Sequence, residues 1–255
     1  MKITIITATY NSESSLQRTI DSVAGQDYEN IEHIIIDGGS TDNTINIIQA
    51  NLIHITKYIS EKDNGIYSAF NAGIKLATGD IIGFLNSDDI FTDSYIISKV
   101  VESFRTKNCD VLYGNLIYQT KNNTNAKTVR YWKSNVFRKS GLKYGWMPPH
   151  PTVYCKKEIY EKYGYYDEKF KISADYDYML RIFKEPLIKK DYLATVMVKM
   201  NVGGVSNGSF SGIYKKSKED IRAIKRNKVG GFYTIICKNL RKLGQFTKSS
   251  IIKLP

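Results

Sequence analysis

Short apolar runs alternate with segments of helical spacing through the first part of the chain. Residues 3–7, 33–36, 53–59 and 81–85 are rich in Ile and other strand-forming residues, and runs of this length predict buried strands. Between them, apolar positions recur three or four residues apart, which predicts helices. The expected helices cover residues 11–25, 42–52 and 67–77. Strands and helices joined by such short connections predict an α/β fold, in which a mostly parallel sheet is flanked by helices on both faces.

The second half of the chain is less regular, and it ends in a segment of helical spacing. The expected strands there cover residues 111–118, 152–154 and 193–200, and the expected helices begin near Thr92 and cover residues 156–163 and 175–183. Residues 121–127 read as a polar loop, and residues 132–145 show no clear period. From Phe210 the pattern predicts two helices broken at Gly230 and Gly231. We therefore expect a main domain over residues 1–210 and a helical extension over residues 211–255.

Polar clusters follow three of the expected strands. They are Thr7-Ala8-Thr9-Tyr10-Asn11, Asp37-Gly38-Gly39-Ser40-Thr41-Asp42 and Asn86-Ser87-Asp88-Asp89. Parallel sheets bind ligands at the carboxyl ends of their strands, so these clusters should meet in one crevice. The glycines of the second cluster would let the backbone approach a ligand, while Asp37 could accept hydrogen bonds from a base or ribose. A tight turn with Ser40 or Asp42 capping a helix explains the same residues.

The acids at Asp88 and Asp89 have two explanations. Hard oxygen ligands at a rigid strand end suit Mg²⁺ or Mn²⁺, which would bridge a diphosphate and neutralise the charge on a departing nucleotide. Alternatively, the two acids simply cap the helix expected near Thr92. Nothing in the sequence matches a P-loop or a GxGxxG fingerprint.

Charge is unevenly distributed along the chain. The formal net charge is +12, and residues 213–255 carry twelve Lys or Arg against Glu219 and Asp220, which leaves about +2 for the remainder. A basic segment on a nearly neutral body predicts an acidic partner such as anionic lipid, nucleic acid or polyphosphate. No apolar run is long enough to span a bilayer, no signal peptide is recognisable, and three widely spaced cysteines fit a reducing cytosol.

The basic segment also carries an apolar stripe. Five apolar residues fall at helical spacing among Lys and Arg: Ile235, Ile236, Leu240, Leu243 and Phe246. This pattern is typical of a helix that lies on an anionic membrane surface, although a helix packed on the body with a solvated basic face explains it as well. Nucleic acid is a weaker candidate partner, because the acids at the strand ends would repel phosphates in the absence of a metal.

Five spaced motifs together resemble family 2 inverting glycosyltransferases of the GT-A fold, over roughly residues 1–205. Four are the three strand-end clusters and Asp63-Asn64-Gly65 with Ala69, Asn71 and Gly73; the fifth is Ser173-Ala174-Asp175-Tyr176-Asp177-Tyr178-Met179-Leu180-Arg181. The order of these motifs is that of the family. The chain is most similar in type to members that assemble bacterial surface polysaccharides such as O-antigen.

The resemblance implies a role for each matching residue. Thr9 and Asp37 would contact the nucleotide base with Asp63 beside it, and Asn11 would belong to the same nucleotide-sugar site. Asp88 would be the metal ligand, in the last position of the family's Asp-x-Asp. The first position of that motif is Asn86 here, whose amide can still bond ribose or a metal-bound water but lowers the local charge.

Asp175 occupies the position of the family's catalytic base, although Ala174 replaces the Glu that often precedes it. The chemistry needs one carboxylate within about 3 Å of the acceptor hydroxyl. Asp177 is the second candidate, and helix capping explains either acid without catalysis. His150 could bind donor phosphate or acceptor, or fill a rigid turn between prolines. Trp146 could stack on a sugar or belong to the core.

The resemblance, together with these residues, implies an enzyme that transfers a hexose from a nucleotide sugar with inversion of the anomeric configuration and with Mn²⁺ or Mg²⁺ as cofactor. UDP-glucose, UDP-galactose and their N-acetyl forms are the expected donors. The expected acceptor is a hydroxyl of a lipid-diphosphate-linked oligosaccharide in O-antigen or capsule assembly. Such a protein would be cytoplasmic and peripheral on the inner leaflet of the membrane. The alternatives are a non-catalytic nucleotide-sugar-binding protein and a nucleic-acid-binding protein, whereas a nucleotidyltransferase would normally carry a Gly-rich basic loop that residues 7–20 lack.

Overall fold

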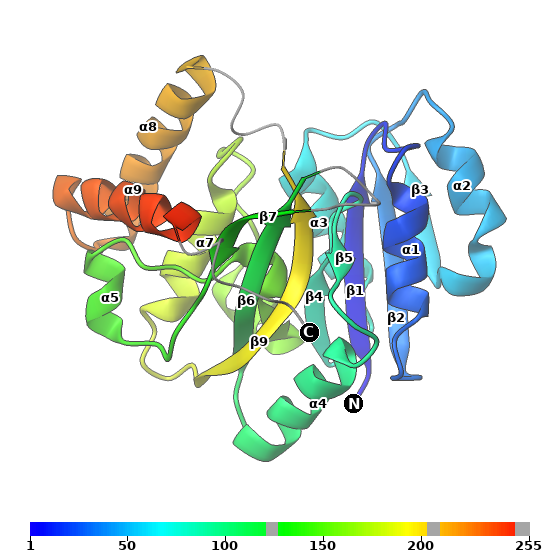
Figure 1. Ribbon diagram of the computed structural model, residues 1–255, viewed down its shortest axis with the longest axis horizontal. Helices are drawn as coiled ribbons and strands as arrows, with labels where there is room; N and C mark the ends of the chain where they lie inside the picture. The colour runs from blue at the N-terminus through cyan, green and yellow to red at the C-terminus, as the bar shows by residue number, and fades with distance from the viewer. Residues whose placement is uncertain (121–126, 203–209, 248–255) are drawn as a thin grey trace.

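A mixed sheet forms the centre of the molecule in the computed structural model, which describes residues 1–120, 127–202 and 210–247 (Figure 1). The strands in chain order are β1 (Ile3–Thr9), β2 (Ile31–Asp37), β3 (Lys57–Ser60), β4 (Ile81–Phe84), β5 (Ile90–Phe91), β6 (Val111–Gln119), β7 (Thr128–Trp132), β8 (Tyr154–Lys156) and β9 (Lys190–Asn201). Across the sheet they follow the order β3-β2-β1-β4-β8-β6-β9-β5, and β7 pairs with β6. The pairs β1–β2, β1–β4, β2–β3 and β6–β9 are parallel. The predicted mostly parallel sheet is therefore confirmed.

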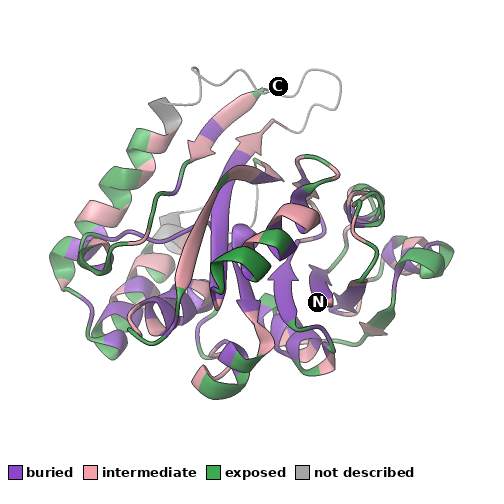
Figure 2. Ribbon diagram, turned by 90° about the horizontal axis from the view of Figure 1, so that it is seen from below, coloured by how far each residue is buried: buried purple, intermediate pink, exposed green. Residues whose placement is uncertain are grey.

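Helices cover both faces of the sheet. They are α1 (Leu16–Ala24), α2 (Thr44–Ala50), α3 (Ile66–Leu76), α4 (Ile96–Lys107), α5 (Lys139–Lys143), α6 (Lys157–Tyr163), α7 (Ala174–Phe183), α8 (Phe210–Asn227) and α9 (Phe232–Thr247). Apolar side chains of α1, α2 and α4 pack on one face, and those of α3, α6 and α7 pack on the other. Figure 2 shows the result, with the central strands largely buried and the exposed positions mainly on the helices and loops. Side chains alternate between the faces of each strand, so Ile5 and Ile6 enter different clusters.

Gly73 sets how closely α3 approaches β1. A Cβ atom at this position would lie 2.5 Å from Cγ2 of Ile6, which is inside any tolerated contact. Glycine therefore allows the helix to lie directly on the strand. The close fit fixes the start of α3, and with it Tyr67, near the carboxyl end of the sheet.

The first helix and the third strand begin later than predicted. Asn11 adopts a left-handed φ of 47°, and α1 begins at Leu16 instead of near residue 11. The reason is that Ser12 bonds to another segment instead of starting the helix. Its amide donates to Oγ1 of Thr44, the first residue of α2, at 2.8 Å. The apolar run at residues 53–59 begins outside the sheet, with Ile53 88% exposed and β3 starting at Lys57.

Three short elements, β5, β7 and α5, were not predicted from the sequence pattern. Residues 90–91 form β5, which pairs antiparallel with β9, so the helix expected near Thr92 begins only at Ile96. Within the stretch without clear period lie the end of β7 and the short helix α5. Both strands depend on partners distant in the sequence, which local periodicity does not reveal. The loop predicted at residues 121–127 lies, apart from Lys127, outside the described residues.

The two helices predicted from Phe210 are present as α8 and α9, and Gly230 between them has a φ of 68°. α8 packs against α7, and α9 packs against β7 and α8 (Figure 1). One side of α9 is buried, as Thr234 and Ile235 show. The domain boundary predicted at residue 210 remains a prediction.

Glu32 is expected to contribute strongly to stability. Its side chain is 1% exposed, and its carboxylate accepts hydrogen bonds from Thr4 Oγ1 at 2.6 Å, Thr78 N at 2.7 Å and Thr78 Oγ1 at 2.6 Å. Burial raises the pKa of Glu32, but these bonds and one from Lys2 outweigh it and lower the pKa to about 2. Stabilisation is therefore full above the ordinary value of 4.5 and is lost as the pH falls through about 2.

Glu32→Gln should lower the free energy of unfolding by about 2 kcal/mol near neutral pH, because charged hydrogen bonds are lost. Urea unfolding at pH 7 and pH 3 would measure the free energy of unfolding of the variant and of the unchanged protein. The difference between the two should be smaller at pH 3. Exposed Glu29 provides the control, since Glu29→Gln removes the same charge without buried partners. An equal difference at both pH values would contradict this account.

Candidate active site

The loops that follow β1 and β2 are joined by hydrogen bonds. The amide of Gly38 donates to the carbonyl of Thr9 at 2.9 Å, and the amide of Thr41 donates to Oδ1 of Asn11 at 2.9 Å. Asn11 donates its own amide to Oγ of Ser40 at 2.8 Å. The left-handed backbone at Asn11, which Asn tolerates better than most residues, makes both contacts of this residue possible. Thr9 and Asn11 therefore lie beside the Asp37 loop, as predicted.

Asp37 is fully buried and holds its own loop together. Its Oδ2 accepts hydrogen bonds from the amides of Gly39 at 3.1 Å and Ser40 at 2.9 Å and from Oγ of Ser60 at 2.7 Å. Its Oδ1 accepts the hydroxyl of Ser40. These contacts fit the interpretation of residues 37–42 as a tight turn. Direct contact between Asp37 and a nucleotide base remains a prediction.

Asp63 lies against the same loop. A Cβ atom at Gly38 would be 3.2 Å from the Asp63 carboxylate, so a side chain at that position would press on the acid. The carboxylate of Asp63 is half-buried and accepts the amide of Gly65 at 2.8 Å. Gly38 and Gly65 therefore let loops from β2 and β3 meet around this acid.

The acids after β4 do not cap a helix, because α4 begins only at Ile96 after Tyr95. Asp89 is completely buried and accepts the side-chain amide of Asn86 at 3.0 Å. Burial, and then the charge of Asp88, raises the pKa of Asp89 well above its ordinary value. Burial therefore disfavours the charged form of Asp89, whereas Asp88 is only half-buried and is the more accessible of the two acids.

This loop is tied to two other elements. The hydroxyls of Ser12 and Ser87 are hydrogen-bonded at 2.8 Å, which joins the loop after β1 to the loop after β4. At the end of β9, Asn201 donates its side-chain amide to the carbonyl of Asp88 at 3.0 Å. The strand-end clusters therefore converge, as the sequence predicts.

Asp175 lies in the first turn of α7, where it contacts the other candidate residues through tyrosine. The hydroxyl of Tyr67 at the start of α3 is shared between two acceptors, the carbonyl of Ile172 at 2.6 Å and Oδ1 of Asp175 at 3.2 Å. The amide of Tyr176 donates to the same oxygen of Asp175 at 2.8 Å. Burial, and then the charge of Asp175, raises the pKa of Tyr67, so this hydroxyl stays protonated and donates. The residue at the helix N-cap position is Ser173.

Tyr118 near the end of β6 lies beside β9, whose last residue Asn201 bonds to Asp88. The guanidinium of Arg130 lies 4.6 Å from the centre of the Tyr118 ring, and burial raises the pKa of Tyr118. Asp175 is joined to the other loops through Tyr67, which lies four residues after Asp63.

Asp177, the second candidate base, has a structural position. It is completely buried, forms an ion pair with Arg181 at 3.0 Å, and accepts the side-chain amide of Asn227 at 2.8 Å. A buried carboxylate with these partners fixes α7 against α8.

His150 and Trp146 are packed into the interior. His150 is 8% exposed, stacks on Phe70 and Phe84, and shares a hydrogen bond of 2.7 Å with Tyr166. Burial lowers its pKa, which keeps the ring neutral and poorly suited to phosphate. Trp146 is 7% exposed and forms part of the main hydrophobic cluster. His150 therefore fits the alternative of a residue that fills a rigid turn, and Trp146 fits the alternative of a core residue.

Three residues near Asp175 were not predicted from the sequence. The sequence has 19 tyrosines, and nothing in the pattern distinguishes Tyr67 and Tyr118 from the others. Glu219 of α8 accepts the amides of Lys171, Ile172 and Ser173, each at 2.9 Å, and so fixes the segment before Asp175. The available signal was that Glu219 is one of two acids in a strongly basic segment.

Two side chains of the β4 loop carry oxygen atoms of the kind that a divalent cation takes. They are the Asp88 carboxylate and Asn86, whose Oδ1 is buried and accepts no hydrogen bond from the described part of the chain. Oxygen ligands of this kind suit Mg²⁺ or Mn²⁺, which take their remaining ligands from water and phosphate. Within residues 1–120, 127–202 and 210–247, no group of three His, Cys, Asp or Glu side chains could hold a metal ion.

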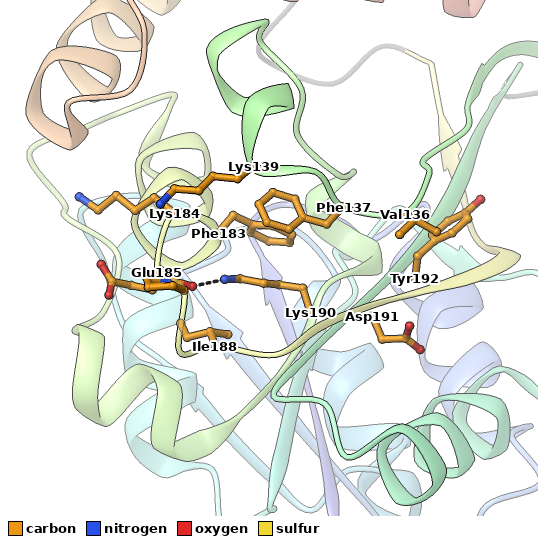
Figure 3. A pocket seen from close by; sticks show the side chains of 11 residues that line it. Val136, Phe137, Lys139, Phe183, Lys184, Glu185, Ile188, Lys190, Asp191 and Tyr192 are labelled. Atoms are coloured by element: carbon orange, nitrogen blue, oxygen red, sulfur yellow. Dashed lines mark hydrogen bonds between the residues drawn. The ribbon is translucent and has the colours of Figure 1, made fainter.

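A separate cavity of about 290 Å³ lies where β9 begins (Figure 3). Lys190 bonds to the main-chain oxygen of Glu185 there, and Phe137, Phe183 and Tyr192 contribute aromatic walls. Lys190 is paired with Val111 at the amino end of parallel β6, whereas the candidate residues follow the carboxyl ends of the strands. This cavity is therefore not the predicted site.

Comparison with known families decides the classification. A sequence profile described as Glycosyl transferase family 2 matches residues 4–171. The chain belongs to glycosyltransferase family 2. The matched region of this family 2 glycosyltransferase includes the strand-end loops and ends just before Asp175.

Curated relatives are also glycosyltransferases. A PGL/p-HBAD biosynthesis glycosyltransferase of Mycobacterium bovis is 28% identical over 208 residues, which cover 80% of this chain and 78% of the relative. An uncharacterised glycosyltransferase of Mycobacterium tuberculosis is 33% identical over 181 residues, covering 70% and 68% of the two chains. These similarities place this family 2 member among glycosyltransferase enzymes.

Solved structures share the fold at low sequence identity. Residues 1–349 of Staphylococcus aureus TarS in complex with UDP-GlcNAc superpose with a TM-score of 0.68 and 17% identity, covering 89% of this chain and 65% of that one. The mannosyltransferase PcManGT of Pyrobaculum calidifontis, in complex with GDP-Man and Mn²⁺, gives a TM-score of 0.66 and 14% identity over 100% of this chain and 76% of that one. This chain covers 44% of a longer TarS chain. The likeness confirms a GT-A-type fold for this glycosyltransferase.

Proposed function

We propose that this enzyme transfers a hexose from UDP-glucose, UDP-galactose or an N-acetyl form to a hydroxyl of a lipid-linked oligosaccharide. The transfer would invert the configuration at the anomeric carbon. The product would enter O-antigen or capsule assembly. Membership of glycosyltransferase family 2 supports the reaction class. The UDP-GlcNAc bound to TarS supports a UDP-sugar donor. The motif resemblance to family members that assemble bacterial surface polysaccharides supports the acceptor class.

The contact between Tyr67 and Asp175 is the observation that carries the proposal. The Tyr67 hydroxyl lies 3.2 Å from Oδ1 of Asp175, and Tyr67 lies four residues after Asp63, whose carboxylate lies against the loop after β2. That loop is bonded to the loop after β1, which is bonded in turn through Ser12 and Ser87 to the loop after β4. A donor diphosphate at the β4 loop and an acceptor hydroxyl at Asp175 would therefore meet in the same region. This is the arrangement that an in-line displacement requires.

Asp175 would act as the base. Its carboxylate takes the proton of the acceptor hydroxyl as that oxygen bonds to the anomeric carbon, and the bond from this carbon to the diphosphate oxygen breaks. Attack opposite the leaving diphosphate inverts the anomeric centre. The hydrogen bonds from Tyr67 and the Tyr176 amide hold one oxygen of Asp175, which leaves the other for the acceptor.

The loops after β1, β2 and β4 would hold the donor. Thr9, Asn11, Asp37 and Asp63 would surround the nucleoside, while Asn86 and Asp88 would face the diphosphate. When Mg²⁺ or Mn²⁺ is bound by Asp88, it supplies positive charge that stabilises the departing nucleoside diphosphate. Asp37 would act mainly by shaping its loop, because its carboxylate is occupied by Gly39, Ser40 and Ser60.

Glu219 would be a positioning residue for Asp175. Glu219→Gln should lower kcat about tenfold with an unchanged KM for the donor, because one of its three amide contacts loses its acceptor. Steady-state kinetics with a UDP-sugar would separate the two constants, and exposed Glu102 on α4 provides the control variant Glu102→Gln. A change in donor KM with unchanged kcat would contradict a positioning role.

The enzyme would be cytoplasmic and peripheral on the inner leaflet, with residues 211–255 as its membrane-binding extension. Exposed apolar residues lie along one side of α9: Phe232, Ile236, Leu240 and Leu243. Their spacing suits insertion at an anionic surface, where nearby Lys and Arg add attraction. Ile235 is buried, and the Phe246 side chain lies outside the described residues. No helix within the described ranges is long and apolar enough to cross a membrane.

A donor-hydrolysis screen tests the proposal. The full chain is incubated with UDP-, GDP- and dTDP-sugars, each with Mn²⁺ and with EDTA. Metal-dependent hydrolysis of a UDP-hexose is the expected result. Binding of a UDP-sugar without any turnover would favour the non-catalytic alternative, whereas salt-sensitive binding of random DNA without donor binding would favour the nucleic-acid alternative.

A further inference from the structure

Four cations gather where α8, α9 and β7 meet. We call them the basic cluster: Arg130 of β7, Lys216 of α8, and Lys238 and Lys242 of α9. Lys238 and Lys242 are one turn apart on α9, and Lys216 is one turn from Asp220 on α8. The ammonium of Lys238 lies 2.7 Å from Asp220, which fixes the register of the two helices.

Contacts between the elements bring the cations together. Arg130 bonds to Gln245, which lies one turn from Lys242 on α9, and Lys238 bonds to Asp220, which lies one turn from Lys216 on α8. Burial lowers the pKa of Lys242, and the charges of Lys216, Arg130 and Lys238 lower it further. Burial also lowers the pKa of Arg130 and of Lys238, and Lys216 adds to the effect on Lys238. Mutual repulsion of this kind costs free energy, and a bound anion would relieve it.

Arg130 is held rigidly in this cluster. Its guanidinium lies over the rings of Tyr118 at 4.6 Å and Trp132 at 4.9 Å, and its Nε donates to Gln245 of α9 at 2.7 Å. A planar guanidinium fixed between aromatic rings loses little side-chain entropy when it binds an anion. Lysines at its side supply charge that can adjust to different phosphate positions.

The basic cluster adjoins the segment that carries Asp175. The Lys238 ammonium lies 3.4 Å from the centre of the Tyr176 ring, and Tyr176 directly follows Asp175. On the outer side of α9 is the exposed apolar stripe that begins at Phe232. An anion in the cluster would thus lie between the proposed base and an apolar surface.

We propose that the basic cluster binds the diphosphate of a lipid-linked acceptor and so brings the acceptor sugar to Asp175. This inference rests on the proposed function and adds to it a second anion site, separate from the donor diphosphate at Asp88. A diphosphate matches several adjacent cations better than a neutral sugar does, because Arg and Lys bind phosphate oxygens through charge-assisted hydrogen bonds. A lipid diphosphate would also place its chain beside the apolar stripe of α9.

Binding of farnesyl diphosphate, with farnesol and inorganic pyrophosphate as comparison probes, tests the inference in the full chain. EDTA is present so that a metal does not bring diphosphate to the donor loop. The double variant Lys216→Gln/Lys242→Gln should bind farnesyl diphosphate at least tenfold more weakly than the unchanged protein. Its affinity for a UDP-sugar in Mn²⁺ should be unchanged, which also shows that the variant is folded.

The double variant Lys215→Gln/Lys218→Gln is the matched control, because it removes the same charge from exposed positions of α8. Equal weakening by both double variants, or equal binding of farnesol and farnesyl diphosphate, would overturn the inference. Inorganic pyrophosphate that binds as tightly as farnesyl diphosphate would overturn the lipid-linked acceptor. If no nucleotide sugar is bound or hydrolysed while cluster-dependent binding persists, the proposed function fails and the anion site stands.

Discussion

Replacement of Asp175 by Asn is expected to lower the rate of sugar transfer about a thousandfold while affinity for the UDP-sugar stays unchanged. The amide keeps the shape of the carboxylate and can still accept from Tyr67 and the Tyr176 amide, but it cannot take the acceptor proton. Single-turnover kinetics would measure the rate, and calorimetry would measure donor binding. A transfer rate within a few-fold of the unchanged enzyme would remove Asp175 from the chemistry.

Asp177→Asn is the matched control two residues along the same helix. Asp177 is buried and paired with Arg181, so its neutralisation should destabilise the protein by about 3 kcal/mol. The folded fraction should retain most of its transfer rate. Opposite effects on rate and stability in the two variants would separate the base from the structural acid.

Asp88→Asn is expected to reduce metal-dependent turnover of the donor by at least about a hundredfold. Asp88 is the partly exposed acid of the β4 loop, while Asp89 is completely buried and its side chain accepts the Asn86 amide, so this one substitution removes the accessible charge that would hold a cation. Donor hydrolysis and donor binding would be measured across a Mn²⁺ titration. The variant should resemble the unchanged enzyme in EDTA.

Asp93→Asn is the corresponding control, because Asp93 lies close in sequence but forms a surface ion pair with Lys99 at 3.3 Å. It should leave the Mn²⁺ dependence unchanged. Turnover by the unchanged enzyme that persists in EDTA and also in the Asp88 variant would show that the reaction needs no metal. Asn86 would then be the expected reason, since it halves the acidic ligands of the family motif.

The convergence of three loops was predictable because it follows from a parallel sheet. Isoleucine-rich runs place Thr9, Asp37 and Asn86 at or just after strand ends, and parallel strands bring such ends to one edge. Asp175 could be predicted only through the resemblance to a family. The residues around Asp175 could not be predicted, because a contact such as that of Tyr67 joins segments 108 residues apart in the sequence.

Burial decided the roles of adjacent acids that look alike in sequence. Asp88 and Asp89 are neighbours, yet only Asp89 is completely buried, and burial raises its pKa. Asp175 and Asp177 share one helix turn, yet Asp177 is sealed against Arg181 and Asn227. In each pair, the difference depends on distant segments that cover one acid and leave the other accessible.

The sequence by itself determined the α/β architecture, the strand-end position of the donor loops and the two C-terminal helices. Each of these is encoded by residues a few positions apart, whose spacing and chemistry are visible along the chain. Only the tertiary structure decided which acids are buried, that Asp37 is occupied by its own loop, and that Glu219 and the basic cluster adjoin the segment around Asp175. Solvent access and charge coupling depend on distances in space, and folding sets those distances between residues far apart in sequence.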